Sequence, residues 1–161
     1  MNRAVPGIAA AVAFWGLAAG AIADEPAFDR KEDVVYGRKY GTALTLDVFT
    51  PTQGANGAGI VWVISGGWFS SHDAIGPGSV APFAKRGYTV FAVVHGSQPL
   101  YTIPDAVQDM SRAVRFIRTH AKDYGIDPNR IGIFGGSAGG HLSLMQGVAA
   151  DTGNLFAKDP V

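Results

Sequence analysis

Residues 44–49 alternate leucine and valine with other residues at a period of two, a spacing typical of a strand with one face in the core. An apolar segment at residues 34–36 precedes them, and residues 37–41 between the two segments begin and end with glycine. Glycine favours tight turns because it adopts positive φ without strain. The pattern therefore predicts an antiparallel hairpin with its turn at residues 37–41.

Beyond the hairpin, continuous apolar runs alternate with helical stretches. The runs predict strands at residues 60–64, 88–94 and 130–134. Helices are predicted at residues 80–86, at residues 104–124, and from the glycine-rich segment 135–140 to about residue 148. This alternation predicts one α/β domain, with a mainly parallel sheet, helices on both faces and the antiparallel hairpin at its start.

The helix over residues 104–124 has the clearest boundary signals. Thr102 precedes it as a candidate N-cap, Pro104 lies in its first turn, and Asp105 follows the cap by three residues. Gly125 is predicted to end it. Its apolar residues fall on one stripe, so we expect the helix to pack one face on the sheet.

Residues 1–23 have the layout of a signal peptide. Arg3 is followed by an uncharged apolar stretch, and Ala21 and Ala23 supply the small residues that precede a cleavage site. We expect cleavage after Ala23, export to the periplasm or the extracellular space, and no stable membrane association afterwards. A retained anchor is the alternative, because about 20 apolar residues can cross a bilayer. The high alanine and glycine content of this stretch favours cleavage.

Composition narrows the chemistry that is available to the chain. The 161 residues include 13 basic and 13 acidic side chains, so the formal net charge is zero and nucleic-acid binding is not expected. With 47% apolar residues, the chain can bury a core. The absence of cysteine excludes disulfides, a thiolate nucleophile and a Cys-ligated zinc. Any catalysis must therefore use oxygen or nitrogen atoms.

A Gly-x-Ser-x-Gly motif lies directly between a predicted strand and a predicted helix. It consists of Gly135, Gly136, Ser137, Ala138 and Gly139. In this setting a strained turn lifts the serine hydroxyl above the carboxyl edge of the sheet, and only glycine fits on both sides. Ser137 is the candidate nucleophile, and the Ala138 N–H can stabilise an oxyanion. A plain glycine-rich turn with an idle serine is the alternative interpretation.

A second glycine-rich segment follows the strand at residues 60–64. It reads Ser65-Gly66-Gly67-Trp68. Backbone N–H groups at the carboxyl end of that strand can point toward Ser137, where a developing oxyanion needs donors. A simple flexible turn is the alternative, because glycine pairs are common in this chain.

Four segments of the chain resemble α/β-hydrolase fold esterases, in particular the carboxylesterase and feruloyl or acetylxylan esterase-like group. They are residues 36–40, 44–49, 61–68 and 135–141. The resemblance covers the amino-terminal half of that fold, and it implies that Ser137 is the nucleophile and that the Gly66 and Gly67 amides belong to the oxyanion hole. The family's loop usually reads His-Gly-Gly-Gly-Trp, whereas Ile64 and Ser65 occupy its first two positions here. The side-chain support of this loop must therefore differ.

A serine nucleophile needs a histidine base and a carboxylate that orients it. In this fold they follow the serine in the order Ser, Asp or Glu, His. His141, Asp151 and Asp159 lie too close to Ser137 along the chain to serve. The resemblance places the acid and the base after later strands. Residues 24–161 are therefore expected to be an incomplete domain, truncated after the nucleophile helix, that neither folds stably nor hydrolyses esters by itself.

Other side chains near the predicted site are candidates for its walls. Trp68, Phe69 and Tyr101 are aromatic residues of loops that could line a substrate pocket. His95 ends a predicted strand, so its side chain could have a supporting role in that pocket. The other histidines before the motif are expected to be structural or solvated.

The residues and the resemblance together predict an exported serine hydrolase that cleaves carboxylic esters, on a small-molecule or polysaccharide-linked substrate, with no metal or organic cofactor. Two alternatives remain open: a secreted non-catalytic binding module or inactive relative, and a serine peptidase on the same fold. Gly76, Gly78 and Ala81 match a dinucleotide-binding pattern. That interpretation fails because the pattern must directly follow a strand.

Overall fold

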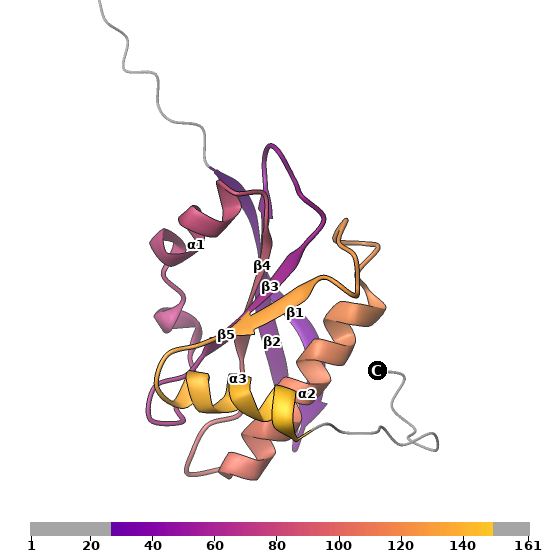
Figure 1. Cartoon of the computed structure of the whole chain (residues 1–161). Coiled ribbons are helices and arrows are strands. Elements are labelled where there is room, and N and C mark those ends of the chain that lie inside the picture. The colour runs from indigo at the N-terminus through magenta and orange to yellow at the C-terminus, as the bar shows by residue number, and fades with distance from the viewer. Residues whose placement is uncertain (1–26, 150–161) are drawn as a thin grey trace, which may run out of the picture.

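The computed structural model describes residues 27–149, in which five strands form one mixed sheet (Figure 1). The strands are β1 (Phe28–Lys39), β2 (Thr42–Pro51), β3 (Gly59–Ile64), β4 (Thr89–Val94) and β5 (Ile131–Phe134). They are arranged in the order β1-β2-β4-β3-β5. β2 pairs antiparallel with β1 and β4, whereas β3 pairs parallel with β4 and β5. The predicted hairpin and the three parallel strands are confirmed, and the expected signal peptide lies outside the described residues.

Helices lie on both faces of the sheet, as the alternation predicts. They are η1 (His72–Ala74, a 3-10 helix), α1 (Pro77–Ala84), α2 (Ile103–Thr119) and α3 (Ala138–Val148). α1 covers one face, and α2 and α3 cover the other (Figure 1). Val61 and Val63 of β3 belong to the core under α2 and α3, while Ile64 belongs to the core under α1. Because β3 is buried on both faces, its sequence is a continuous apolar run.

β1 is much longer than the predicted apolar segment, because it also includes five consecutive charged residues at positions 29–33. β1 lies at the edge of the sheet, where charged side chains reach solvent. Lys39 pairs with Thr42, so the turn consists of Tyr40 and Gly41, both with positive φ, rather than of five residues as predicted. Local alternation could not reveal a strand whose pairing is interrupted by two register shifts.

The boundaries of α2 follow its capping residues at one end only. The Thr102 hydroxyl accepts a hydrogen bond from the Asp105 N–H, and the Asp105 carboxylate accepts one from the Thr102 N–H, which confirms the N-cap. α2 ends at Thr119, five residues before the predicted end. The following residues form a turn closed by a hydrogen bond from the Ile126 N–H to the Ala121 carbonyl.

Within residues 27–149, no helix is long and apolar enough to cross a membrane.

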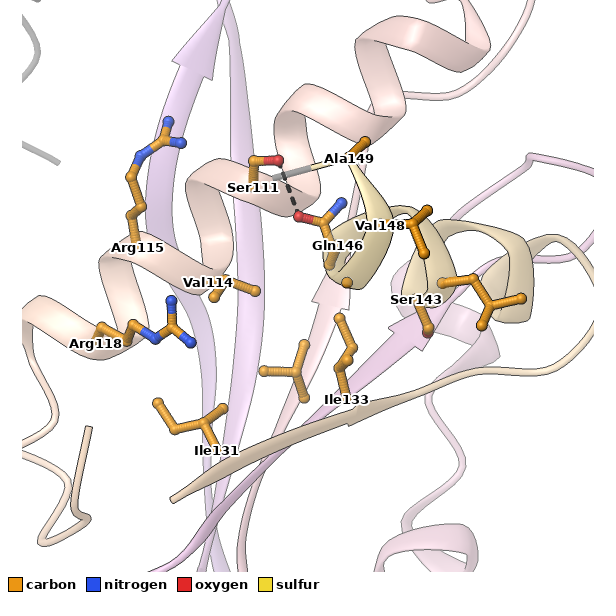
Figure 2. Close-up of a pocket in the computed structure, with 13 residues that line it drawn as sticks. Ser111, Val114, Arg115, Arg118, Ile131, Ile133, Ser143, Gln146, Val148 and Ala149 are labelled. Atoms are coloured by element: carbon orange, nitrogen blue, oxygen red, sulfur yellow. Dashed lines mark hydrogen bonds between the residues drawn. The ribbon is translucent and has the colours of Figure 1, made fainter. Parts of the chain in front are cut away.

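β5 is the outer strand of the sheet within the described residues, and its Ile131 and Ile133 are only half-buried. Beside it, a groove of about 610 Å³ lies between α2, α3 and β5 (Figure 2). Across this groove the Ser111 hydroxyl of α2 donates a 2.9 Å hydrogen bond to the Gln146 side chain of α3. The residues that line the groove do not include Ser137. The groove therefore belongs to the open edge of the sheet and is distinct from the candidate site.

Asp47 is fully buried in β2, although its position in the alternation predicts a polar face. Its carboxylate accepts two hydrogen bonds from the Arg30 guanidinium and one of 3.1 Å from the Asp33 N–H. It also lies 3.4 Å from His72 Nδ1. A buried carboxylate is tolerated only when it is paired in this way. Asp47 thereby fastens the hairpin to the segment that follows β3.

We predict that Asp47→Ala lowers the free energy of unfolding by about 1–3 kcal/mol, because its removal breaks the part-buried hydrogen bonds that the Arg30 guanidinium and the Asp33 N–H donate to this carboxylate. Glu32→Ala is the matched control, since Glu32 is an exposed partner of the same Arg30. Its effect should stay within about 0.5 kcal/mol. Urea unfolding of the full-length protein measures both values. Equal effects of the two substitutions would contradict this account of Asp47.

Candidate active site

Ser137 occupies the sharp connection between β5 and α3. Its backbone has φ 51° and ψ −120°, a conformation that non-glycine residues rarely adopt and that costs on the order of 1–3 kcal/mol. Ser137 is the N-cap of α3, but its side chain makes no capping hydrogen bond, and the residue is exposed. The strained strand-to-helix turn that the motif predicts is therefore present, with a hydroxyl that is accessible from solvent.

Two glycines make this turn possible through close backbone contacts. A Cβ atom at Gly135 would lie 2.6 Å from the Gly139 carbonyl carbon, and one at Gly139 would lie 2.8 Å from the Val63 carbonyl oxygen. Real Cβ atoms do not approach backbone atoms so closely. Gly136, by contrast, has no atom within 4 Å of the corresponding position. The first and last glycines of the motif are sterically required, as the sequence predicts, and the second is not.

The segment after β3 forms a tight turn at the same edge of the sheet. Gly66 and Phe69 exchange two backbone hydrogen bonds, of 3.0 and 2.9 Å. The enclosed Gly67 and Trp68 have φ of 57° and 62°. Positive φ at both central residues is the geometry of a two-residue hairpin turn, and it costs little at glycine but is strained at tryptophan.

This turn changes which amides are available to an oxyanion. The Gly66 N–H already donates to the Phe69 carbonyl, so it is not the free donor that the sequence predicts. The N–H groups of Gly67, Trp68 and Ala138, in contrast, have no hydrogen-bond acceptor within residues 27–149. Pairing across the turn uses the Gly66 amide and leaves those of Gly67 and Trp68 without an acceptor among the described residues.

The turn and the first turn of α3 lie against each other. The position of a Cβ at Gly139 is 3.5 Å from the Ser65 carbonyl oxygen. The Trp68 and His141 rings meet edge to face, with centroids 6.0 Å apart and an interplanar angle of 77°. The Trp68 Nε1 atom is buried and has no partner among the described residues. These contacts place the turn after β3 beside the first turn of α3, which begins directly after Ser137.

The three aromatic residues predicted to line a pocket, Trp68, Phe69 and Tyr101, do not all lie near Ser137. Phe69 is 58% exposed, and Trp68 is half-buried beside α3. Tyr101, however, is buried, stacks on Tyr40 and donates its hydroxyl to the Lys39 carbonyl. It therefore packs on the hairpin rather than lining a pocket near Ser137. Sequence position alone could not distinguish these directions.

His95 is buried directly beside the glycine-rich turn. Its Nδ1 lies 2.8 Å from the Gly96 carbonyl, and its Nε2 lies 2.9 Å from the Ser65 hydroxyl. A carbonyl oxygen can only accept, so Nδ1 carries the proton. Burial lowers the pKa of His95 below its ordinary value, which favours the neutral ring. In that form Nε2 accepts the hydrogen bond that the Ser65 hydroxyl donates.

No described side chain is placed to activate Ser137. Within residues 27–149 its hydroxyl has no hydrogen-bond partner, and His95 already uses both ring nitrogens. His120 Nδ1 contacts the Phe116 carbonyl within its own helix. His72 of η1 contacts the hairpin, with Nε2 2.6 Å from the Thr45 hydroxyl. His72 and His120 therefore have structural contacts, as expected from the sequence.

One group of side chains has the composition of a metal site. Asp33, Asp47 and His72 bring ligand atoms within 4.8 Å of one another. Arg30 already donates two hydrogen bonds to Asp47, and His72 Nε2 lies 3.1 Å from the Asp33 carboxylate. A cation there would compete with the Arg30 guanidinium for the same carboxylate. The group is best described as an ion-pair network between the hairpin and η1.

The sheet order, the strained serine between β5 and α3 and the glycine-rich turn after β3 together define an α/β-hydrolase. Residues 46–159 match the family described as BD-FAE. The chain belongs to this family.

Relatives and solved structures agree with this membership. A probable carboxylic ester hydrolase, LipM of Mycobacterium tuberculosis, is 36% identical over 117 residues, which are 70% of this chain and 27% of LipM. A probable isoprenylcysteine alpha-carbonyl methylesterase of Oryza sativa is 32% identical over 111 residues, 68% of this chain and 26% of that protein. The chain therefore spans about a quarter of the length of these relatives.

Two similar solved structures are also esterases. One is a truncated form of a carbohydrate esterase from gut microbiota, with a TM-score of 0.67, 32% identity, and coverage of 76% of this chain and 45% of that chain. The other is the apo form of Thermogutta terrifontis esterase 2, with a TM-score of 0.65, 31% identity, and coverage of 75% and 46%. The predicted α/β-hydrolase fold and the resemblance to esterases are confirmed.

We predict that Gly135→Ala lowers the free energy of unfolding by about 1–3 kcal/mol, because the new methyl group overlaps the backbone of α3. Gly136→Ala is the matched control, since its methyl group meets no atom within 4 Å. Denaturant unfolding of the full-length protein measures the two values. A Gly135→Ala variant as stable as Gly136→Ala would mean that α3 does not approach the turn as described.

A second prediction concerns pH. Burial lowers the pKa of His95, the Gly96 carbonyl and Asp109 oppose that shift, and Lys39 adds to it. The unfolded chain then binds more protons than the folded one as pH falls below about 6.5, so the free energy of unfolding decreases on acidification. We expect the decrease between pH 7.5 and pH 5 to be smaller in His95→Asn than in the wild type. Equal slopes in urea unfolding would show that His95 does not contribute.

Proposed function

We propose that the protein is an exported serine hydrolase that cleaves carboxylic esters, with Ser137 as the nucleophile. The observation that carries this proposal is the exposed Ser137 at a strained junction, followed by the Ala138 amide and near a turn that contacts α3. The amides of Ala138, Gly67 and Trp68 have no acceptor within residues 27–149. Strained backbone persists where it serves a function, and an accessible hydroxyl beside free N–H donors suits acyl transfer.

The proposed mechanism follows from these positions. The Ser137 oxygen attacks the ester carbonyl, and the carbonyl oxygen takes the negative charge of the tetrahedral intermediate. The N–H of Ala138, at the positive end of α3, and those of Gly67 and Trp68 stabilise that charge. Collapse of the intermediate releases the alcohol and leaves an acyl group on Ser137. Water then attacks the acyl-enzyme. A second tetrahedral intermediate forms, with its oxyanion held by the same amides, and its collapse releases the acid and restores Ser137.

The base and the acid of the triad come, in this proposal, from a part of the protein outside residues 27–149. Ser137 needs a histidine to accept its proton, and the described histidines are engaged elsewhere or lie on the same helix. The order Ser, acid, His of this fold places both groups after the nucleophile. The open edge at β5 is consistent with further strands that carry them.

The proposed substrates are carboxylic esters of small molecules or of polysaccharides. The names of the relatives support the first class, and the carbohydrate esterase among the similar structures supports the second. Export is proposed from residues 1–23. A single cation, an apolar stretch and small residues follow one another there, in the order typical of a secretory signal.

The proposal predicts that a fluorophosphonate probe labels the full-length protein and that Ser137→Ala abolishes labelling. Hydrolysis of p-nitrophenyl acetate should fall by at least about 10⁴-fold in the same variant, because the nucleophile is lost. Ser79→Ala is the control, since Ser79 is an exposed serine of α1. No labelling of the wild type would overturn the proposal in favour of a non-catalytic protein, and labelling that survives in Ser137→Ala would show that another residue is the nucleophile.

A further inference from the structure

Ser70, which follows the glycine-rich turn, is hydrogen-bonded to residues at the ends of β3 and β4. The Ser70 hydroxyl donates to the Ile64 carbonyl and accepts a 3.2 Å hydrogen bond from the His95 N–H. The Ser70 N–H donates to the Ser97 hydroxyl at 2.8 Å, and that hydroxyl donates back to the Ser70 carbonyl at 3.2 Å. Ser70 is thus hydrogen-bonded both to the end of β3 and to the residues that follow β4.

At the start of the turn, one side-chain hydrogen bond is present among residues 27–149. Ser65 lies directly before Gly66, and its hydroxyl donates to His95 Nε2 at 2.9 Å. His95 itself is 3% exposed, so water does not compete for this bond. Because Ser65 also lies beside Gly139 of α3, this bond acts on the part of the turn that faces the nucleophile.

His95 is in turn held by α2 and β1. Its Nδ1 donates to the Gly96 carbonyl, and the Gly96 N–H donates to the buried Asp109 carboxylate at 3.0 Å. Lys39 Nζ donates to the other oxygen of Asp109 at 2.7 Å. Every polar atom of the His95 ring has a partner, and the ring orientation is fixed on both sides. A fixed acceptor is what a positioning hydrogen bond requires.

We propose that the Ser65–His95 hydrogen bond is a positioning device for the oxyanion hole, which holds the Gly67 and Trp68 amides toward the Ser137 side of the site. This inference rests on the proposed function. Ser65 and His95 touch neither the substrate nor the reacting atoms, and they act through the turn. The pair supplies side-chain support at Ser65, the residue between the end of β3 and the turn.

The test compares variants of the full-length protein in p-nitrophenyl acetate hydrolysis. Ser65→Ala removes the donor and should lower kcat about tenfold with little change in KM, because the amides matter mainly in the transition state. Ser65→Thr keeps the hydroxyl and should restore most of kcat. His95→Asn keeps a donor at the Nδ1 position but removes the acceptor for Ser65, so it should match Ser65→Ala. The double variant should be no slower than either single variant.

Several outcomes would overturn the positioning role. Unchanged kcat in Ser65→Ala, a rise in KM alone, or multiplicative losses in the double variant would each contradict it. Fluorophosphonate attached to Ser65 would show that Ser65 reacts itself and would also contradict it. Loss of activity in Ser137→Ala combined with full activity in Ser65→Ala would reject only the Ser65–His95 role. Full activity in Ser137→Ala would instead reject the proposed function. If His95→Asn fails to fold, Ser65→Ala and Ser65→Thr decide alone.

Discussion

The first turn of α3 packs directly on the backbone of β3, with no side chain between them. At Gly139 even a methyl group would stand 2.8 Å from the Val63 carbonyl oxygen. Contact at this range is available only to glycine, and it forces the chain between β5 and α3 into a bend that Ser137 completes at φ 51°. The strain at Ser137 is therefore maintained by packing of the helix on the sheet, and the exposed hydroxyl is its consequence.

The same contact decides what lies beside the serine. Since α3 rests on the end of β3, it also rests on the segment that leaves β3, and the Trp68 and His141 rings meet there. Three parallel strands end at this edge, which places their following loops side by side. The loop after β3 is braced by the loop after β4, through Ser70, Ser97 and His95. A rigid turn with free amides needs such a brace, because donors that are already oriented lose no free energy to reorganisation.

Charged residues stabilise the parts of the fold that surround this edge. Asp109 is buried between the Gly96 N–H and the Lys39 ammonium, and so links α2 to the loop after β4. Asp47 is buried between Arg30 and the segment that contains η1. Both carboxylates accept several hydrogen bonds, which offsets the loss of hydration. These two buried carboxylates thus connect loops to the sheet and to α2.

Much of this arrangement was predictable from local sequence. The apolar run of β3, the capping box of α2 and the glycine spacing around Ser137 each depend on neighbours within a few residues, and each prediction was confirmed. The charged start of β1 was missed because an edge strand does not need an apolar pattern. The end of α2 was misplaced because the chain turns at Ala121 to reach β5, under the control of packing.

The sequence by itself determined the alternation of strands and helices, the strained serine turn and the presence of a glycine-rich segment after β3, because steric and periodic requirements act over short distances. Only the tertiary structure decided which amides are free. The pairing of Gly66 with Phe69 withdraws one predicted donor, and the His95 ring meets Ser65 from 30 residues away. Hydrogen bonds between distant segments depend on how strands are ordered in the sheet, and no local pattern of residues encodes that order.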